Sequence, residues 1–167
     1  MEADKFIAGK KVLIVDDEPD ILDQLTELLD MCRIDTADSF EAAKNLLETE
    51  PYDIAVLDIM GVRGFELLSI ANEHGIPALM LTAHGLSEEN LKKSAQEGAH
   101  YYAPKDRMSD IVLFVADVLE AKEKKRSPWA RWADRLGSYY DRKFHGTGWR
   151  EKEKAFWEDR MKTLPLV

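Results

Sequence analysis

Acidic, hydroxyl and amino side chains follow apolar runs in this 167-residue sequence, at Asp16, Asp17, Asp58, Thr82 and Lys105. Two carboxylates about 4 Å apart repel by several kcal/mol at an effective dielectric constant near 20, so three of them in one site need a compensating cation. Mg²⁺ fits this need, because it binds carboxylate oxygens and bridges to phosphate. A carboxylate surrounded by a metal ion, a lysine and a hydroxyl group can accept a phosphoryl group as an acyl phosphate.

Each of these residues also has a purely structural explanation when it is taken alone. Asp58 and Thr82 are residue types that cap the turn after a strand. Lys105 by itself is typical of a solvated surface charge. The chemical interpretation therefore depends on a fold that brings the separate segments together.

The stretch 54–60, I-A-V-L-D-I-M, predicts a strand that ends at Asp58 and lies at the centre of such a fold. Four consecutive apolar residues, two of them β-branched, are typical of a strand that is covered on both faces. This strand delivers Asp58 toward its carboxyl end, where open parallel α/β sheets place their ligand crevice. Shorter or similar apolar runs predict four further strands, at residues 11–15, 34–37, 76–81 and 101–103.

Helical patterns separate these strands, and the predicted helices begin near Pro19, Ser39, Phe65, Ser87 and Ile111. Proline in the first turn and serine at the N-cap are typical helix starts. Strands that alternate with helices predict a doubly wound α/β fold with right-handed crossovers. A flavodoxin-like five-stranded parallel sheet in the order 2-1-3-4-5 suits about 120 residues, and it brings the ends of strands 1 and 3 to the switch point.

These motifs together resemble the receiver domain of two-component response regulators. The matching elements are the pair Asp16-Asp17, Asp58 in L-D-I-M, Thr82 in L-T-A, and Lys105 in G-A-H-Y-Y-A-P-K. The resemblance covers about residues 10 to 122, with the elements in the family's order. It implies a phosphoprotein that is not an enzyme beyond its own phosphotransfer and dephosphorylation, and whose partner is a sensor histidine kinase or a phosphotransfer protein.

The resemblance also implies a Mg²⁺ site. Asp58 corresponds to the phosphoacceptor, Asp17 to a direct metal ligand and Asp16 to a ligand that acts through water. The backbone carbonyl of Met60 completes the protein ligands that the family's pattern implies.

Two further roles are implied by the likeness. Thr82 and Tyr102 correspond to the switch pair, which moves inward on phosphorylation, and Lys105 to the lysine that binds the phosphoryl group. Without the family pattern, Tyr102 would be read as an ordinary half-buried aromatic residue.

The sequence departs from the family in two places. Only five residues, 59–63, separate Asp58 from Gly64, where family members usually have a longer loop that contains Pro and Gly. Asp106 follows Lys105, where the family has proline across a cis bond, and we expect a trans bond because a cis bond before a non-proline residue costs about 3 kcal/mol. We read the protein as a response regulator that accepts a phosphoryl group on Asp58, and these departures are the arguments for the alternative of a pseudo-receiver, an interaction module without phosphorylation. A phosphatase with a second Asp two residues after its nucleophile does not fit, since that residue is Met60.

Composition suggests where the protein works. Hydrophobic residues make up 45% and charged residues 33%, as in globular proteins, and no apolar run approaches the roughly 18 residues that span a membrane. The first 11 residues lack the apolar core of a secretion signal. The one cysteine, Cys32, cannot form an internal disulfide. We therefore expect a cytoplasmic protein without a membrane partner.

Charge divides the chain into two parts. Residues 1–120 carry 10 basic and 25 acidic residues, a net charge of −15, whereas residues 121–167 carry 13 basic and 7 acidic residues, a net charge of +6. We predict a receiver domain at residues 1–126 and a helical tail at residues 127–167. A basic segment is a cue for an acidic partner, including the chain's own acidic part. Nucleic acid is an unlikely partner, since no recognition-helix pattern is present.

The tail predicts a helical hairpin. Ser127-Pro128 is a helix start, residues 145–148 form a turn, and a second aromatic face continues to Leu164. Eight aromatic residues lie between Trp129 and Trp157, more than a segment of about 40 residues can bury by itself. We predict that the tail docks on the receiver domain or on a second copy, and we favour a homodimer with exchanged hairpins. The residues expected to form that contact are Trp132, Leu136, Phe144 and Trp157.

Overall fold

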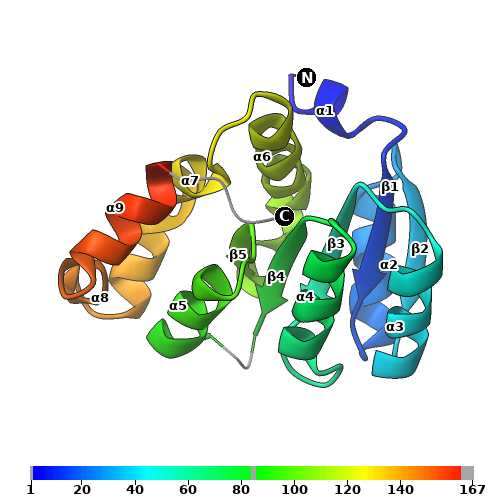
Figure 1. Cartoon of the computed structure of the whole chain (residues 1–167), viewed down its shortest axis with the longest axis horizontal. Helices are drawn as coiled ribbons and strands as arrows, with labels where there is room; N and C mark the ends of the chain where they lie inside the picture. The colour runs from blue at the N-terminus through cyan, green and yellow to red at the C-terminus, as the bar shows by residue number, and fades with distance from the viewer. Residues whose placement is uncertain (1, 84–85, 163–167) are drawn as a thin grey trace.

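Five parallel strands form the centre of the protein in a computed structural model that describes residues 2–83 and 86–162. Their order across the sheet is β2-β1-β3-β4-β5, and every neighbouring pair is parallel (Figure 1). This order confirms the predicted flavodoxin-like sheet. The strands are β1 (Lys11–Val15), β2 (Arg33–Ala37), β3 (Ile54–Asp58), β4 (Ala78–Thr82) and β5 (Tyr101–Pro104).

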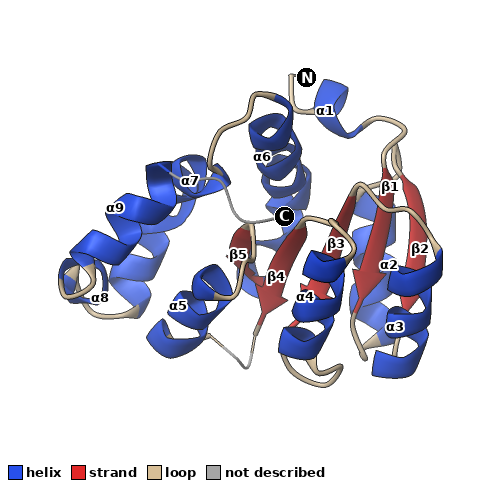
Figure 2. Cartoon of the chain, in the orientation of Figure 1, coloured by secondary structure: helices blue, strands red, loops and turns tan. Residues whose placement is uncertain are grey.

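Helices cover both faces of the sheet (Figure 2). Two of them pack together on one face, and three lie on the other. The pair is α2 (Pro19–Leu28) and α6 (Ile111–Glu123); the three are α3 (Phe40–Thr49), α4 (Gly64–Glu73) and α5 (Glu88–Gln96). The predicted start signals function as expected: Ser39 and Ser87 each accept a hydrogen bond from a backbone N–H in the first turn of the helix that follows.

Some boundaries differ from the sequence prediction. Strand β4 begins at Ala78, two residues after the predicted start at Ile76, whereas β3 ends at Asp58 as predicted. Two short elements were not predicted, the helix α1 (Asp4–Ile7), which packs against α6, and the 3₁₀ helix η1 (Lys105–Asp110). Elements of four to six residues are too short to show a helical repeat in the sequence, which explains why the pattern missed them.

The tail is helical, but its second half is broken. Helix α7 (Pro128–Lys143) starts as predicted, with Ser127 Oγ accepting a hydrogen bond from Trp129 N. The single helix expected after it is instead α8 (Gly148–Glu151) and α9 (Lys154–Lys162). In a continuous helix eight residues span about 12 Å, whereas the break brings the rings of Trp149 and Trp157 to 5.5 Å between centroids. Leu164 lies outside the described residues.

The tail packs against the receiver part of its own chain, beside strand β5 and helices α5 and α6 (Figure 1). Trp132, Leu136 and Trp157 are buried there, and Phe144 packs at the margin of the same cluster. Burial of these aromatic side chains therefore does not require a second copy. A homodimer through these residues stays a prediction, and it would require two chains to exchange their tails.

Candidate functional site

The predicted reactive residues meet at the carboxyl-terminal edge of the sheet. Asp16 directly follows β1, Asp58 is the last residue of β3, Thr82 is the last residue of β4, and Lys105 directly follows β5. Parallel strands place all these ends on one side, which explains why residues up to 89 positions apart come together. Asp16, Asp58 and Thr82 are buried.

Lys105 connects the acidic residues of this edge. Its Nζ atom lies 2.7 Å from Asp16 Oδ2, 3.4 Å from Asp58 Oδ1 and 3.7 Å from Glu18 Oε2. Only 10% of the Lys105 side chain is exposed. Glu18 was not among the predicted site residues, although it is the third acid of the run Asp16-Asp17-Glu18 and its backbone N–H donates to Asp16 Oδ1 at 2.9 Å.

The crowding of charge changes the protonation of the site. The pKa of Asp58 is raised to about 6, chiefly by burial and also by the charges of Asp16 and Asp17, while the positive charge of Lys105 opposes the rise. Burial alone would lower the pKa of Lys105, but its hydrogen bond to Asp16 and the charges of Asp58 and Glu18 raise it. Because the pKa of Asp58 lies near neutral pH, a further cation beside this residue would favour the ionised form of its carboxyl group.

Three carboxylates form a donor set that suits a divalent cation. One oxygen each of Asp16, Asp17 and Asp58 lies within 4.8 Å of the other two. Oxygen donors of this kind are the ligands that Mg²⁺ prefers. Gly61, with φ of 86°, lies against Asp17, and a Cβ atom at position 61 would come 2.5 Å from Asp17 Oδ2. The loop after β3 therefore leaves room for the Asp17 carboxylate only because residue 61 is glycine.

The short loop after Asp58 closes by a tight backbone contact. The Gly64 N–H donates to the Ile59 carbonyl at 3.1 Å, and a Cβ atom at position 64 would lie 2.2 Å from the Asp58 carbonyl oxygen. Gly64 thus allows α4 to begin directly beside the end of β3, and its role was not predicted. Met60 lies in this loop with 51% of its surface exposed. The role of its carbonyl as a metal ligand stays a prediction.

Lys105 adopts its position without the family's cis bond. No cis peptide bond occurs within the described residues, so the bond between Lys105 and Asp106 is trans, as the sequence predicted. The 3₁₀ helix η1 begins at Lys105.

The predicted switch residues lie on the two strands nearest the tail. Thr82 pairs with Pro104 across β4 and β5, and Tyr102 pairs with Met80. Tyr102 is fully buried, and its phenol oxygen accepts a hydrogen bond from Ser87 N at 3.3 Å. Ser87 ends the segment that connects Thr82 to α5. Tyr102 is therefore hydrogen-bonded to the segment that follows Thr82. Tyr102 also lies next to the tail.

Comparison with known proteins identifies the class. Residues 12–115 match the response regulator receiver domain, and this match covers more than half of the chain. The chain belongs to this family. No finding supports the alternative of a pseudo-receiver.

Individual relatives agree with this assignment. Over 112 residues the chain is 47% identical to the heme response regulator HssR of Staphylococcus aureus, in an alignment that covers 64% of this chain and 50% of that protein. The chain therefore spans about half the length of the curated relatives it matches. The family match ends within α6, so the tail lies outside it.

Solved structures show the same fold. A CheY-like receiver domain protein of Methanospirillum hungatei JF-1 superposes with a TM-score of 0.64 at 28% identity, covering 71% of this chain and 99% of that one. The BeF3-activated receiver domain of DrrB superposes with a TM-score of 0.60 at 26% identity, covering 67% and 98%. Within residues 2–83 and 86–162, no helix has both the length and the apolar character needed to cross a membrane.

Proposed function

We propose that this protein is a phosphoacceptor of a two-component system, in which Asp58 receives a phosphoryl group from a histidine kinase or a phosphotransfer protein in a Mg²⁺-dependent reaction. The observation that supports this most directly is the position of Asp58 at the end of β3, within a cluster of three carboxylates and 3.4 Å from Lys105. A carboxylate nucleophile requires such cations to remain ionised despite its burial.

The transfer follows from the groups at this edge. A carboxylate oxygen of Asp58 attacks the phosphorus atom of the donor, the bond from phosphorus to the donor's imidazole nitrogen breaks, and its electron pair stays on that nitrogen. The product is an acyl phosphate on Asp58. Lys105 then holds one phosphoryl oxygen by its charge, and the Thr82 hydroxyl donates a hydrogen bond to another.

The carboxylates of Asp16, Asp17 and Asp58, with the carbonyl of Met60, are the groups that would hold Mg²⁺. When bound, Mg²⁺ neutralises the crowded carboxylates and the charge on the phosphoryl oxygens. The related DrrB domain has been described in a BeF3-activated form, which supports the use of the same reagent as a phosphoryl mimic here.

The decisive experiment is phosphorylation by acetyl phosphate, followed by intact mass. We expect one added phosphoryl group on the wild-type protein with Mg²⁺, and none after chelation with EDTA or in Asp58→Asn. Asp38→Asn is the matched control, since Asp38 is an exposed acid that follows β2 at the same edge of the sheet. Label that persists in Asp58→Asn would contradict the assignment of the acceptor.

We also propose that the protein works in the cytoplasm, that its tail carries the response, and that it needs no nucleic acid or membrane partner. The lone cysteine and the acidic receiver part support these proposals. A homodimer through the tail residues would require two chains to exchange their tails. Sedimentation of the full chain tests whether such a dimer forms.

A further inference from the structure

The outer edge of β5 is occupied by side chains of the tail. Strand β5 is an edge strand, paired with β4 in the five-stranded sheet. On its free side, Trp132 Nε1 and the Tyr140 hydroxyl both donate to the Tyr102 carbonyl, at 2.8 and 2.9 Å. Trp129 Nε1 donates to the carbonyl of Ala99, just before the strand, at 3.1 Å. The tail thus supplies donors where a sixth strand would have supplied its backbone.

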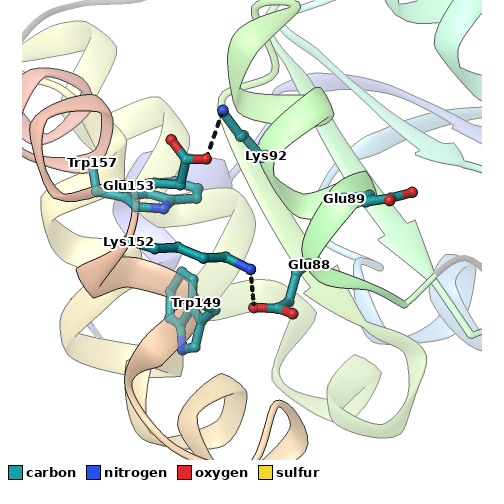
Figure 3. Close-up of a pocket in the computed structure, with 7 residues that line it drawn as sticks. All are labelled: Glu88, Glu89, Lys92, Trp149, Lys152, Glu153 and Trp157. Atoms are coloured by element: carbon teal, nitrogen blue, oxygen red, sulfur yellow. Dashed lines mark ion pairs between the residues drawn. The ribbon is translucent and has the colours of Figure 1, made fainter.

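The tail is also fixed to the helices on both sides of β5. Toward α5, Lys92 pairs with Glu153 at 3.0 Å and Lys152 pairs with Glu88 at 3.4 Å. Figure 3 shows both ion pairs bridging from the tail to α5, beside Trp149 and Trp157. These two ion pairs therefore attach the tail to α5, beside the outer edge of β5.

On the other side, α7 is joined to α6 through a buried acid. Arg135 Nε lies 2.5 Å from Asp117 Oδ2, and Arg131 Nη1 lies 3.6 Å from Asp117 Oδ1. Asp117 is buried, so this contact holds α7 against the receiver part at a defined position. This contact with α6 and the ion pairs with α5 hold the tail over the outer edge of β5 from both sides. We call this arrangement the clamp.

The clamp restricts the side chain of Tyr102. The Tyr140 ring lies 5.7 Å from the Tyr102 ring, and the Trp132 ring stacks on Tyr140 at 5.5 Å. All three residues are fully buried. An outward rotation of Tyr102 would have to displace Tyr140 and with it α7, so the docked tail admits only the buried position of the phenol.

We propose that the tail is a built-in ligand of β5 that selects the buried position of Tyr102, so that tail docking and phosphorylation of Asp58 strengthen one another. This inference rests on the proposed function, because it takes Thr82 and Tyr102 as the switch pair. If phosphorylation draws Tyr102 inward and docking holds it there, each event favours the same state. Thermodynamic linkage then requires the effect to be equal in both directions. Trp132 and Tyr140 are positioning residues in this scheme, since they act on the site through Tyr102.

The test uses the full chain with Mg²⁺ and beryllofluoride, which stands in for the phosphoryl group on an aspartate. The test variant is Trp132→Phe with Tyr140→Phe, which removes both hydrogen bonds to the Tyr102 carbonyl and keeps aromatic rings in place. The matched control is Trp149→Phe with Tyr139→Phe, which removes one indole N–H and one hydroxyl that bond to Asp141 and Asp106 instead. The readouts are beryllofluoride affinity and hydrogen exchange of residues 128–143.

We expect beryllofluoride to slow hydrogen exchange of α7 in the wild type and in the control. In the test variant we expect this slowing to disappear and the beryllofluoride affinity to fall by about fivefold or more, the lower range of measured allosteric couplings. A merely structural role would lower the melting temperature without changing the response to beryllofluoride. Acrylamide quenching of wild-type fluorescence is a second readout, because all four tryptophans lie in the tail.

Three results would overturn the inference. Beryllofluoride that binds the wild type without slowing exchange of α7, or that speeds it, would show that docking and phosphorylation are not mutually favourable while leaving the proposed function intact. Equal affinity in the test variant and the control would have the same meaning. If beryllofluoride and acetyl phosphate both fail to react with the wild type, the proposed function and the inference fall together. If the double variant does not fold, Tyr140→Phe alone takes its place in the comparison with the control.

Discussion

The two edges of the sheet, β2 and β5, are treated differently by the chain. Strand β2 is largely open, with only Ala37 buried, whereas every residue of β5 is buried. The sequences differ accordingly: β2 carries Arg33 and Asp35, while Tyr101-Tyr102-Ala103-Pro104 contains no charge. Charged residues protect an exposed edge from pairing with other chains, and an uncharged aromatic edge needs a cover. The comparison indicates that the tail serves as the cover of the β5 edge.

The largest difference between the edges should appear when a covering side chain is removed. Trp129 is fully buried between the tail and the end of the sheet, and we expect Trp129→Ala to lower the free energy of unfolding by about 3–5 kcal/mol. Ile34→Ala on β2 is the control, and we expect a cost of about 1 kcal/mol, since Ile34 is only partly buried. Urea unfolding followed by circular dichroism measures both. Equal costs would mean that the tail adds little to the stability of β5.

The central sheet could be predicted from the sequence because its strands are continuous apolar runs that stop at polar residues. The runs of β3 and β4 are buried at every position, as expected for strands that are covered on both faces. The edge strand β5 is only four residues long, and its aromatic pair predicted a strand without indicating what covers it. The cover comes from residues about 30 positions later in the chain.

The carboxylates of the candidate site could be predicted for a similar reason, since strand ends carry Asp16 and Asp58 to one edge. Contacts that depend on loop geometry could not. The clearance that Gly61 gives Asp17 depends on a positive φ in a loop whose path no repeat reveals. The hydrogen bonds from the tail indoles to β5 depend on the angle at which α7 crosses the strand, which no periodicity encodes.

A pH dependence should distinguish the β5 edge, because His100 lies directly before β5 and β2 contains no histidine. The pKa of His100 is lowered to about 4, chiefly by burial and also by the charge of Lys122, while a backbone hydrogen bond with Gly98 opposes the shift. The unfolded chain therefore binds a proton near pH 6.5 that the folded chain does not bind until about pH 4. The stability from neutral His100 is complete above pH 6.5 and is lost as the pH falls toward 4.

We expect the free energy of unfolding to fall by about 2 kcal/mol from this cause between pH 7.5 and 4.5. His100→Gln removes the titrating group, so its stability should decline less over the same range. His74→Gln is the control, since His74 is exposed at the end of α4 and the buried His100 remains. Urea unfolding at a series of pH values gives the comparison, and parallel profiles for the two variants would refute this origin of the pH dependence.

The smallest of these differences concerns one arginine at each edge. Arg135 reaches across from the tail and makes a bidentate contact with Asp117, with Nε to Oδ2 at 2.5 Å and Nη2 to Oδ1 at 3.1 Å. The Asp117 side chain is only 2% exposed and also accepts a hydrogen bond from the Tyr101 hydroxyl at 2.8 Å. On β2, Nε of the exposed Arg33 donates a hydrogen bond to the Gly9 carbonyl at 3.1 Å. The two arginines therefore differ in whether they neutralise a buried charge.

We expect Arg135→Ala to cost about 2 kcal/mol, below the 3–5 kcal/mol of a fully broken buried pair, because Arg131 remains near Asp117 and Arg135 is itself 29% exposed. Arg33→Ala should cost about 0.5 kcal/mol, as surface substitutions do. Asp117→Asn in the Arg135→Ala background removes a buried charge that Arg131 alone would have to neutralise, and it should restore part of the loss. Urea unfolding of the single and double variants measures this as a coupling energy. Costs that simply add would show that Asp117 and Arg135 act independently, and the tail would then be held to α6 by packing alone.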